Sequence, residues 1–263
     1  MAVARKECLT PFRKNEVRVM RIALAAAPVK NQNVAFNTSS MINQIHRASG
    51  KADVILFGES VLQGFDCLVW DYEIDRHMAL DIKDAPILQL REAARESKIA
   101  VSFGFIECSD DLLYSSQIFI GADGEIVNVF HRVSIGWRVA SRTDFHYREG
   151  THFEKFQYGG KCFAIGLCGD LWTEGRPEEM MALCVDIVLW PVWCDYDFAE
   201  WNQKLKHEYA SQAALCGKDV LLVNPFCADP DGCAAGGCAH FQNGRIIKEQ
   251  PAGEAGVLIT DVK

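Results

Sequence analysis

The chain has 263 residues, of which 49% are hydrophobic and 24% are charged, and its formal net charge is -8. The acidic excess disfavours nucleic-acid binding, which needs concentrated lysine and arginine, and no stretch is apolar for long enough to span a bilayer. Eleven cysteines, an odd number spread over a long chain, do not suit a complete disulfide framework. We therefore expect a cytoplasmic protein with reduced thiols and a small-molecule partner.

Residues 1–16 are polar and basic and lack the apolar run of a signal peptide. We expect this segment to be an extension outside the core. Residues 17–263 contain no linker, internal repeat or low-complexity block. Because α/β folds of this length often form one domain, we expect residues 17–263 to form a single domain.

Short β-rich apolar runs recur along the chain, with stretches of helical periodicity between several of them, as is typical of an α/β fold with a mostly buried sheet. Turn residues at Asp123-Gly124 and Asn243-Gly244 predict two antiparallel hairpins. The expected strands span residues 19–26, 54–57, 99–106, 117–120, 163–167, 187–190 and 220–223, and the expected helices span residues 37–48, 85–97, 177–185 and 201–216.

Three segments place a reactive side chain just past the carboxyl end of an expected strand, where ligands of open α/β sheets bind. Glu59 follows four apolar residues and Gly58, and a partly desolvated carboxylate is a good proton acceptor near neutral pH. Cys168 ends a strand before Gly169, which permits a tight turn with backbone N–H groups near the thiol. Arg132 could hold a developing negative charge.

Each of these residues also has an interpretation without chemistry. Glu59 fits a helix cap or a surface carboxylate, and Arg132 fits an exposed ion-pair partner. Most free cysteines behave as small buried hydrophobes, which is the alternative for Cys168. The position of the three residues at strand ends, rather than their residue type, favours a shared site.

Together the three segments resemble the nitrilase superfamily, the carbon–nitrogen hydrolases, over residues 17–263 and in the order glutamate, cation, cysteine. The sequence Phe57-Gly58-Glu59 resembles the family's Phe-Pro-Glu, with Gly58 in place of proline, and Cys168-Gly169-Asp170 is similar to its Cys-x-Asp elbow. Further matching landmarks are Gly104-Phe-Ile-Glu107, Tyr114-Ser-Ser, Asp123-Gly124, Arg148-Glu-Gly150 and Leu189-Trp-Pro191.

One departure concerns the family's catalytic lysine, which Arg132 replaces in this chain. No lysine lies between Lys98 and Lys155, so a shifted alignment does not restore it. The additional glutamate that many amidases of the family carry also has no evident counterpart, and Asp144 is the nearest downstream carboxylate. Arginine keeps the positive charge, but it cannot act as a proton donor.

The resemblance implies a four-layer αββα sandwich with mixed sheets and a homodimer or higher homo-oligomer. It also implies hydrolysis of a non-peptide carbon–nitrogen bond in a small amide, nitrile or carbamoyl compound. Cys168 would form a thioester acyl-enzyme, Glu59 would be the general base, and Arg132 with the backbone N–H near Gly169 would bind the oxyanion. No metal or organic cofactor is expected, nor any nucleic-acid or membrane partner.

Further site candidates are Asp170, by its place in the elbow, and Glu107, either a carboxylate supporting the site or a strand-end surface group. Trp193 and Tyr196 follow a strand in an aromatic stretch and are either substrate contacts or packing residues.

Two other functions remain open from the sequence. One is a catalytically impaired relative that acts as a ligand-binding or scaffold protein. The other is a zinc protein that uses Cys216, Cys227, Cys233 and Cys238, although their spacing lacks the Cys-x-x-Cys pairs of structural zinc sites.

Overall fold

The computed structural model describes residues 19–229 and 234–263, so the expected extension at residues 1–16 lies outside the described residues. The first of two large sheets has six strands in the order β14-β1-β3-β4-β5-β6. Its central strands β1, β3 and β4 run parallel, while β14, β5 and β6 pair antiparallel with their neighbours. The bounds are β1 (Met20–Ala26), β3 (Val54–Phe57), β4 (Ala100–Ser109), β5 (Leu112–Ile120), β6 (Ile126–His131) and β14 (Gly256–Val262).

The second large sheet repeats this plan, with strands in the order β13-β12-β10-β9-β8-β7. Strands β8, β9 and β10 run parallel, and β7, β12 and β13 pair antiparallel. A short parallel pair joins β2 (Pro28–Val29) to β11 (Phe226–Cys227). The bounds of the large sheet are β7 (Lys155–Tyr158), β8 (Lys161–Ile165), β9 (Ile187–Pro191), β10 (Asp219–Val223), β12 (Cys238–Gln242) and β13 (Arg245–Gln250).

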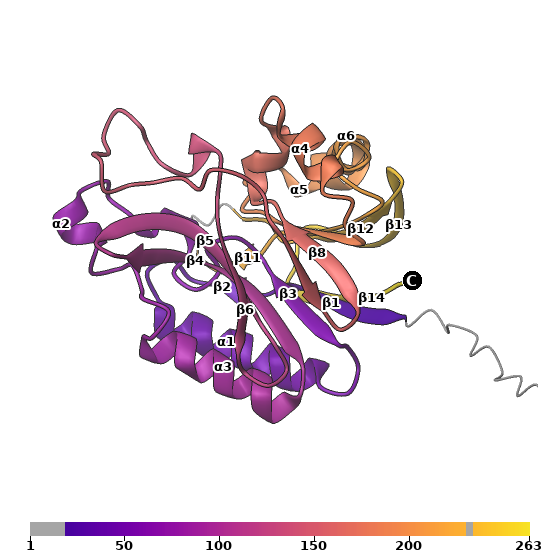
Figure 1. Ribbon diagram of the computed structural model, residues 1–263, viewed down its shortest axis with the longest axis horizontal. Coiled ribbons are helices and arrows are strands. Elements are labelled where there is room, and N and C mark those ends of the chain that lie inside the picture. Colours follow the sequence, from indigo (N-terminus) through magenta and orange to yellow (C-terminus); the bar gives the residue numbers. More distant parts are fainter. Residues whose placement is uncertain (1–18, 230–233) are drawn as a thin grey trace, which may run out of the picture.

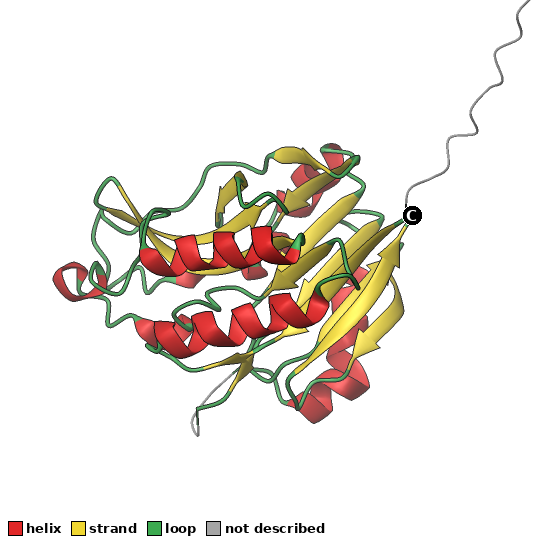
Figure 2. Ribbon diagram, turned by 90° about the horizontal axis from the view of Figure 1, so that it is seen from below, coloured by secondary structure: helices red, strands yellow, loops and turns green. Residues whose placement is uncertain are grey.

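Helices cover the outer face of each sheet, which makes the four-layer αββα sandwich that the resemblance implied. Helices α1 (Val34–Ala48) and α3 (Ala85–Ser97) lie side by side on the first sheet, while α4 (Arg176–Ala182) and α6 (Lys206–Ala213) lie over the second (Figures 1 and 2). Shorter segments are α2 (Tyr72–Asp75), α5 (Phe198–Glu200), the single 3-10 turns Phe65–Cys67, Ile135–Trp137 and Cys168–Trp172, and the π-helical Trp201–Leu205.

No helix in the described part of the chain combines the length and the apolar composition needed to cross a membrane.

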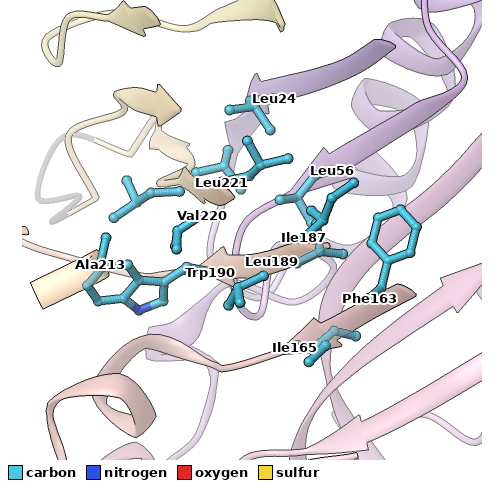
Figure 3. Close-up of a cluster of buried hydrophobic side chains, with 14 of the residues drawn as sticks. Leu24, Leu56, Phe163, Ile165, Ile187, Leu189, Trp190, Ala213, Val220 and Leu221 are labelled. Atoms are coloured by element: carbon cyan, nitrogen blue, oxygen red, sulfur yellow. The ribbon is translucent and has the colours of Figure 1, made fainter. Parts of the chain in front are cut away.

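The strands read as nearly continuous apolar runs because both of their faces are buried. Leu24 and Leu56 of the first sheet point toward Leu189 and Leu221 of the second, and Phe163 packs in the same layer (Figure 3). Their neighbours in the first sheet face the other way, into a separate core beneath α1 and α3; this second core includes Ala23, Ala25, Ile55 and Phe57. Alternation along each strand thus builds two cores from one sheet.

The local elements expected from the sequence are confirmed, with shifted ends. The hairpin β5–β6 turns at Gly124, which has φ 81°. The hairpin β12–β13 turns at Asn243 and Gly244, with φ 48° and 72°, as a two-residue turn with positive φ at both positions requires. The expected helix at 201–216 is divided into the π-helical stretch and α6.

Two glycines allow the chain to pass closely around Glu59, just beyond β3. A Cβ at Gly104 of β4 would lie 2.4 Å from the backbone nitrogen of Ser60 and 2.7 Å from Cα of Glu59. A Cβ at Gly58 would lie 2.4 Å from Cδ of Pro225, so the proline ring occupies the space beside this glycine. The turn that carries Glu59 is therefore held between β4 and the segment after β10.

We predict that Gly104→Ala destabilises the fold by about 1–3 kcal/mol, because the added methyl meets backbone atoms that cannot rotate away. Urea denaturation measures this change. The matched control is Gly256→Ala, also in a strand, where the three atoms nearest to the added methyl all belong to the end of the flexible Gln250 side chain. We expect this control to stay within about 0.5 kcal/mol of the parent protein. Equal stabilities for the two variants would contradict the close approach described here.

Candidate active site

Glu59, Arg132 and Cys168 converge from different strands of the two sheets. Glu59 lies two residues beyond β3 and Arg132 directly follows β6, both in the first sheet, while Cys168 lies three residues beyond β8 in the second. Arg132 Nη1 donates a 2.8 Å hydrogen bond to Glu59 Oε1. The charges of Glu59 and Arg132 both act on the pKa of the Cys168 thiol, so the three groups share one electrostatic environment.

The carboxylate of Glu59 is fully buried, and its two oxygens differ in their partners. Oε1 accepts from Arg132 Nη1 and from Ser115 Oγ, the latter at 3.0 Å. Oε2 has no hydrogen-bond partner among the described residues. One oxygen is thus fixed in place while the other is available to take a proton.

The guanidinium of Arg132 is only 4% exposed and is oriented at two of its nitrogens. Besides the bond to Glu59, Nε donates to Ser134 Oγ at 2.9 Å. Burial lowers the pKa of Arg132, but the opposing charges of Glu59, Cys168 and Asp170 outweigh it and the net shift is upward. Arg132 therefore stays charged inside the site.

Cys168 occupies a strained turn between β8 and the helical turn Cys168–Trp172. Its φ of 43° is in the left-handed region, which is unusual for a residue with a side chain and is often found at functional sites. The indole nitrogen of Trp190 donates to the carbonyl of Cys168 at 2.9 Å and holds this turn. The side chain is half-buried, with Sγ 3.8 Å from the carbonyl oxygen of Trp193.

The surroundings of Cys168 favour the protonated form of its thiol. A hydrogen bond with Cys194 and burial raise the pKa of Cys168 well above its ordinary value, and Glu59 adds to this effect while Arg132 opposes it. The thiolate is the nucleophilic form of cysteine. A nucleophilic role for Cys168 therefore requires a base that removes its proton.

Asp170 connects the cysteine turn to the segment that carries Arg132. Its Oδ2 accepts from the backbone nitrogen of Leu167 at 2.9 Å, and its Oδ1 accepts from the backbone nitrogens of Val133 and Ser134 at 3.1 and 2.8 Å. Burial raises the pKa of Asp170 to about 6, with Arg132 opposing the rise. The side chain thus positions two parts of the site.

Gly169 provides space for the arginine. A Cβ at this position would lie 2.7 Å from Arg132 Nη2 and 3.5 Å from Ser134 Oγ. Nη2 therefore lies against the backbone of the cysteine turn, and no hydrogen bond from it to another described residue is found. Both N–H groups of Nη2 are therefore without a partner among the described residues.

Glu107 lies on the other face of the first sheet. Its Oε2 accepts from Ser116 Oγ at 2.6 Å and lies 2.9 Å from His131 Nε2. Alternation along the strands places Glu107 and Ser116 on the helix-covered face, whereas Ser115 faces the second sheet. The described contacts of Glu107 do not include Glu59, Arg132 or Cys168.

The rings of Trp193 and Tyr196 are both engaged in packing. Trp193 is 7% exposed and stacks on Phe65 with the ring centroids 6.2 Å apart. Tyr196 stacks on Trp201 at 4.4 Å, and its hydroxyl donates to the carbonyl of Gly236 at 2.9 Å. These contacts favour the packing interpretation, although the backbone carbonyl of Trp193 still faces Cys168.

Three contacts of the site were not expected from the sequence: Ser115 on Glu59, Ser134 on Arg132, and Cys194 on Cys168. Each contact depends on how turns of the chain pack against one another. A serine or cysteine in the sequence does not by itself indicate such a contact.

No group of three or more histidine, cysteine, aspartate or glutamate side chains in residues 19–229 and 234–263 is arranged to hold a metal ion. Of the four cysteines considered for zinc, Cys233 lies outside the described residues.

Comparisons with known proteins identify the family of the chain. A family model described as Carbon-nitrogen hydrolase matches residues 21–263. An arylacetonitrilase from Hypocrea virens (strain Gv29-8 / FGSC 10586) is 34% identical over 119 residues, which are 41% of this chain and 36% of that protein. An (R)-stereoselective amidase from Pseudomonas sp is 24% identical over 170 residues, which are 65% of this chain and 59% of the amidase. The chain thus spans less than two thirds of the length of these curated relatives.

Among solved structures, a double mutant of the amidase from Nesterenkonia sp. AN1 in complex with acrylamide has the same fold, with a TM-score of 0.75 at 18% identity. The superposition covers 97% of this chain and 94% of the amidase. Because the family model extends from β1 to the last residue, the chain belongs to the carbon–nitrogen hydrolase family.

Proposed function

We propose that the chain hydrolyses a non-peptide carbon–nitrogen bond of a small amide, nitrile or carbamoyl compound, with Cys168 as nucleophile and Glu59 as general base. The observation that carries this proposal is the oxygen Oε2 of Glu59, buried without a partner among the described residues and close enough to raise the pKa of the Cys168 thiol. Relatives named arylacetonitrilase and amidase support this class of bond.

For an amide, the first half of the reaction forms an acyl-enzyme. Glu59 takes the thiol proton as the sulfur of Cys168 attacks the carbonyl carbon. The oxyanion of the tetrahedral intermediate is stabilised by Arg132 Nη2 and the backbone N–H near Gly169. Glu59 then returns the proton to the departing nitrogen, the carbon–nitrogen bond breaks, and ammonia or an amine leaves a thioester on Cys168.

The second half releases the acid and restores the thiol. Glu59 removes a proton from water as the water oxygen attacks the thioester carbon, and the same donors stabilise the second oxyanion. The carbon–sulfur bond breaks, and the sulfur recovers its proton from Glu59.

Arg132 has an electrostatic role in this scheme. Its guanidinium does not give up a proton in proteins, so both proton transfers fall to Glu59. The bond from Nη1 holds the carboxylate oxygen that does not act as base, and the bond to Ser134 fixes the plane of the guanidinium. A planar cation held at two points then presents its third nitrogen to the substrate oxygen.

We predict that Cys168→Ala and Glu59→Gln each abolish turnover, because one removes the nucleophile and the other removes its base. Ammonia release from a panel of small amides, nitriles and carbamoyl compounds measures the activity, and circular dichroism verifies the fold. Cys184→Ala changes an exposed cysteine and is the matched control, with activity expected to match the parent. Full activity in either site variant would disprove this mechanism.

Arg132→Met is predicted to lower kcat/KM by about 100- to 1000-fold, because it removes an oxyanion donor and leaves the buried charge of Glu59 without its partner. Arg132→Lys keeps the charge and is expected to retain or raise the activity. The control Arg91→Met removes an ion pair with Glu125 on the surface and should leave kcat/KM unchanged. If Arg132→Met turned over as fast as the parent, the proposed oxyanion role would be wrong.

Gly169→Ala is predicted to lower kcat by about 100-fold, since the added methyl displaces Arg132 Nη2 from the cysteine turn and small misplacements of catalytic groups have effects of this size. Steady-state kinetics should show a smaller change in KM than in kcat. Gly256→Ala, at the edge of the first sheet, serves again as control. An unchanged kcat in Gly169→Ala would mean that Nη2 does not contact the transition state.

A further inference from the structure

A second thiol lies beside the nucleophile. Strands β8 and β9 are parallel neighbours, with Ile165 opposite Leu189, so the chain leaves both strands at the same edge of the second sheet. Cys168 follows three residues after β8, and Cys194 follows three residues after β9. Adjacent strands lie about 4.8 Å apart, which is within the separation of Cα atoms that a disulfide spans.

The side-chain contacts agree with this placement. Cys194 is the foremost cause of the raised pKa of the Cys168 thiol, which requires the two side chains to be neighbours. Cys168 Sγ is also 3.8 Å from the carbonyl oxygen of Trp193, which belongs to the peptide group linking Trp193 to Cys194. The strand pairing and this contact therefore place Cys168 and Cys194 next to each other.

Cys194 is held in this position from the other side. Its backbone nitrogen donates to Asn224 Oδ1 at 3.0 Å, and Asn224 Nδ2 donates to its carbonyl oxygen at 3.0 Å. Its Sγ lies 3.4 Å from the hydroxyl of Tyr209. Both cysteines are half-buried, so a small oxidant can reach them while the surroundings keep the pair aligned.

We infer that Cys168 and Cys194 form a reversible disulfide when the protein meets a hydroperoxide. Glu59 takes the proton of the Cys168 thiol, and the thiolate attacks the terminal oxygen of the hydroperoxide. The oxygen–oxygen bond breaks, Cys168 becomes a sulfenic acid, and the departing alkoxide or hydroxide takes the proton from Glu59. The sulfur of Cys194 then attacks the sulfur of Cys168, the sulfur–oxygen bond breaks, and hydroxide leaves with the thiol proton as water. Two thiols are oxidised by two electrons in total, and one hydroperoxide is reduced to water and an alcohol, or to two waters if it is hydrogen peroxide.

This bond would protect the nucleophile as well as block it. A sulfenic acid without a nearby thiol proceeds to sulfinic acid, which dithiol reductants do not reverse, whereas a disulfide is reduced back to two thiols. Inhibition by the disulfide rests on the proposed function. The bond itself is detected by mass, so a failure to form it is distinguishable from a lack of hydrolase activity.

The test is to treat the full chain with hydrogen peroxide, alkylate the remaining thiols, and digest it with a protease that cleaves after glutamate. Such cleavage separates residues 155–174, which contain Cys162 and Cys168, from residues 180–200, which contain Cys184 and Cys194. We expect a linked pair of these peptides, with fragment ions joining Cys168 to Cys194. Dithiothreitol should abolish the linked pair and, where turnover is measurable, restore the activity.

The two cysteines of the second peptide provide a matched pair of variants. Cys184→Ser should retain the linked pair, and Cys194→Ser should lose it and accumulate sulfinic acid at Cys168 that dithiothreitol does not reverse. A linked pair that persists in Cys194→Ser, or sulfinic acid forming equally fast in the parent chain, would overturn the inference. If Cys194→Ser does not fold, the parent chain and Cys184→Ser still test the proposal. The proposal is wrong if neither protein gives a linked pair, or if the link joins Cys162 or Cys184 instead.

Discussion

The buried ion pair between Glu59 and Arg132 constrains the rest of the site. Either charge alone would be costly to bury, and each is paired and hydrogen-bonded instead, Glu59 with Ser115 and Arg132 with Ser134. The pair joins the end of β3 to the segment after β6. In the first sheet, β4 and β5 lie between these two strands. The conformation of these two strand ends is therefore set by electrostatics as well as by packing.

The proposed nucleophile, Cys168, comes from the other sheet, and Asp170 and several glycines allow it to lie near the ion pair. Asp170 receives backbone N–H groups from both the cysteine turn and the arginine segment, so neither can move without breaking a buried hydrogen bond. Gly169 leaves the space into which the guanidinium extends, and Gly58 and Gly104 leave the space around Glu59. A side chain at any of these three glycine positions would clash with the atoms that lie against the glycine.

The proton of Cys168 connects the proposed hydrolysis with the proposed disulfide. A hydrogen bond from the Cys168 thiol to Cys194 and burial both raise the pKa of Cys168, so both reactions depend on a base taking that proton. Glu59 is oriented for this by the same bonds that neutralise its charge. Cys194 raises the pKa of the Cys168 thiol. In the proposed oxidation, the same residue forms the disulfide with Cys168.

The sequence by itself determined the features that depend on local chemistry. Apolar runs ending in Glu59 and Cys168 predicted strands with reactive ends, and the turn residues Gly124 and Gly244 predicted the hairpins, because periodicity and positive φ are properties of short segments. Only the tertiary structure decided which face of β4 carries Glu107, and that Ser115 and Cys194 contact the catalytic candidates. Those contacts depend on strand register and on two sheets packing against each other, which involve residues far apart in the chain and leave no local pattern.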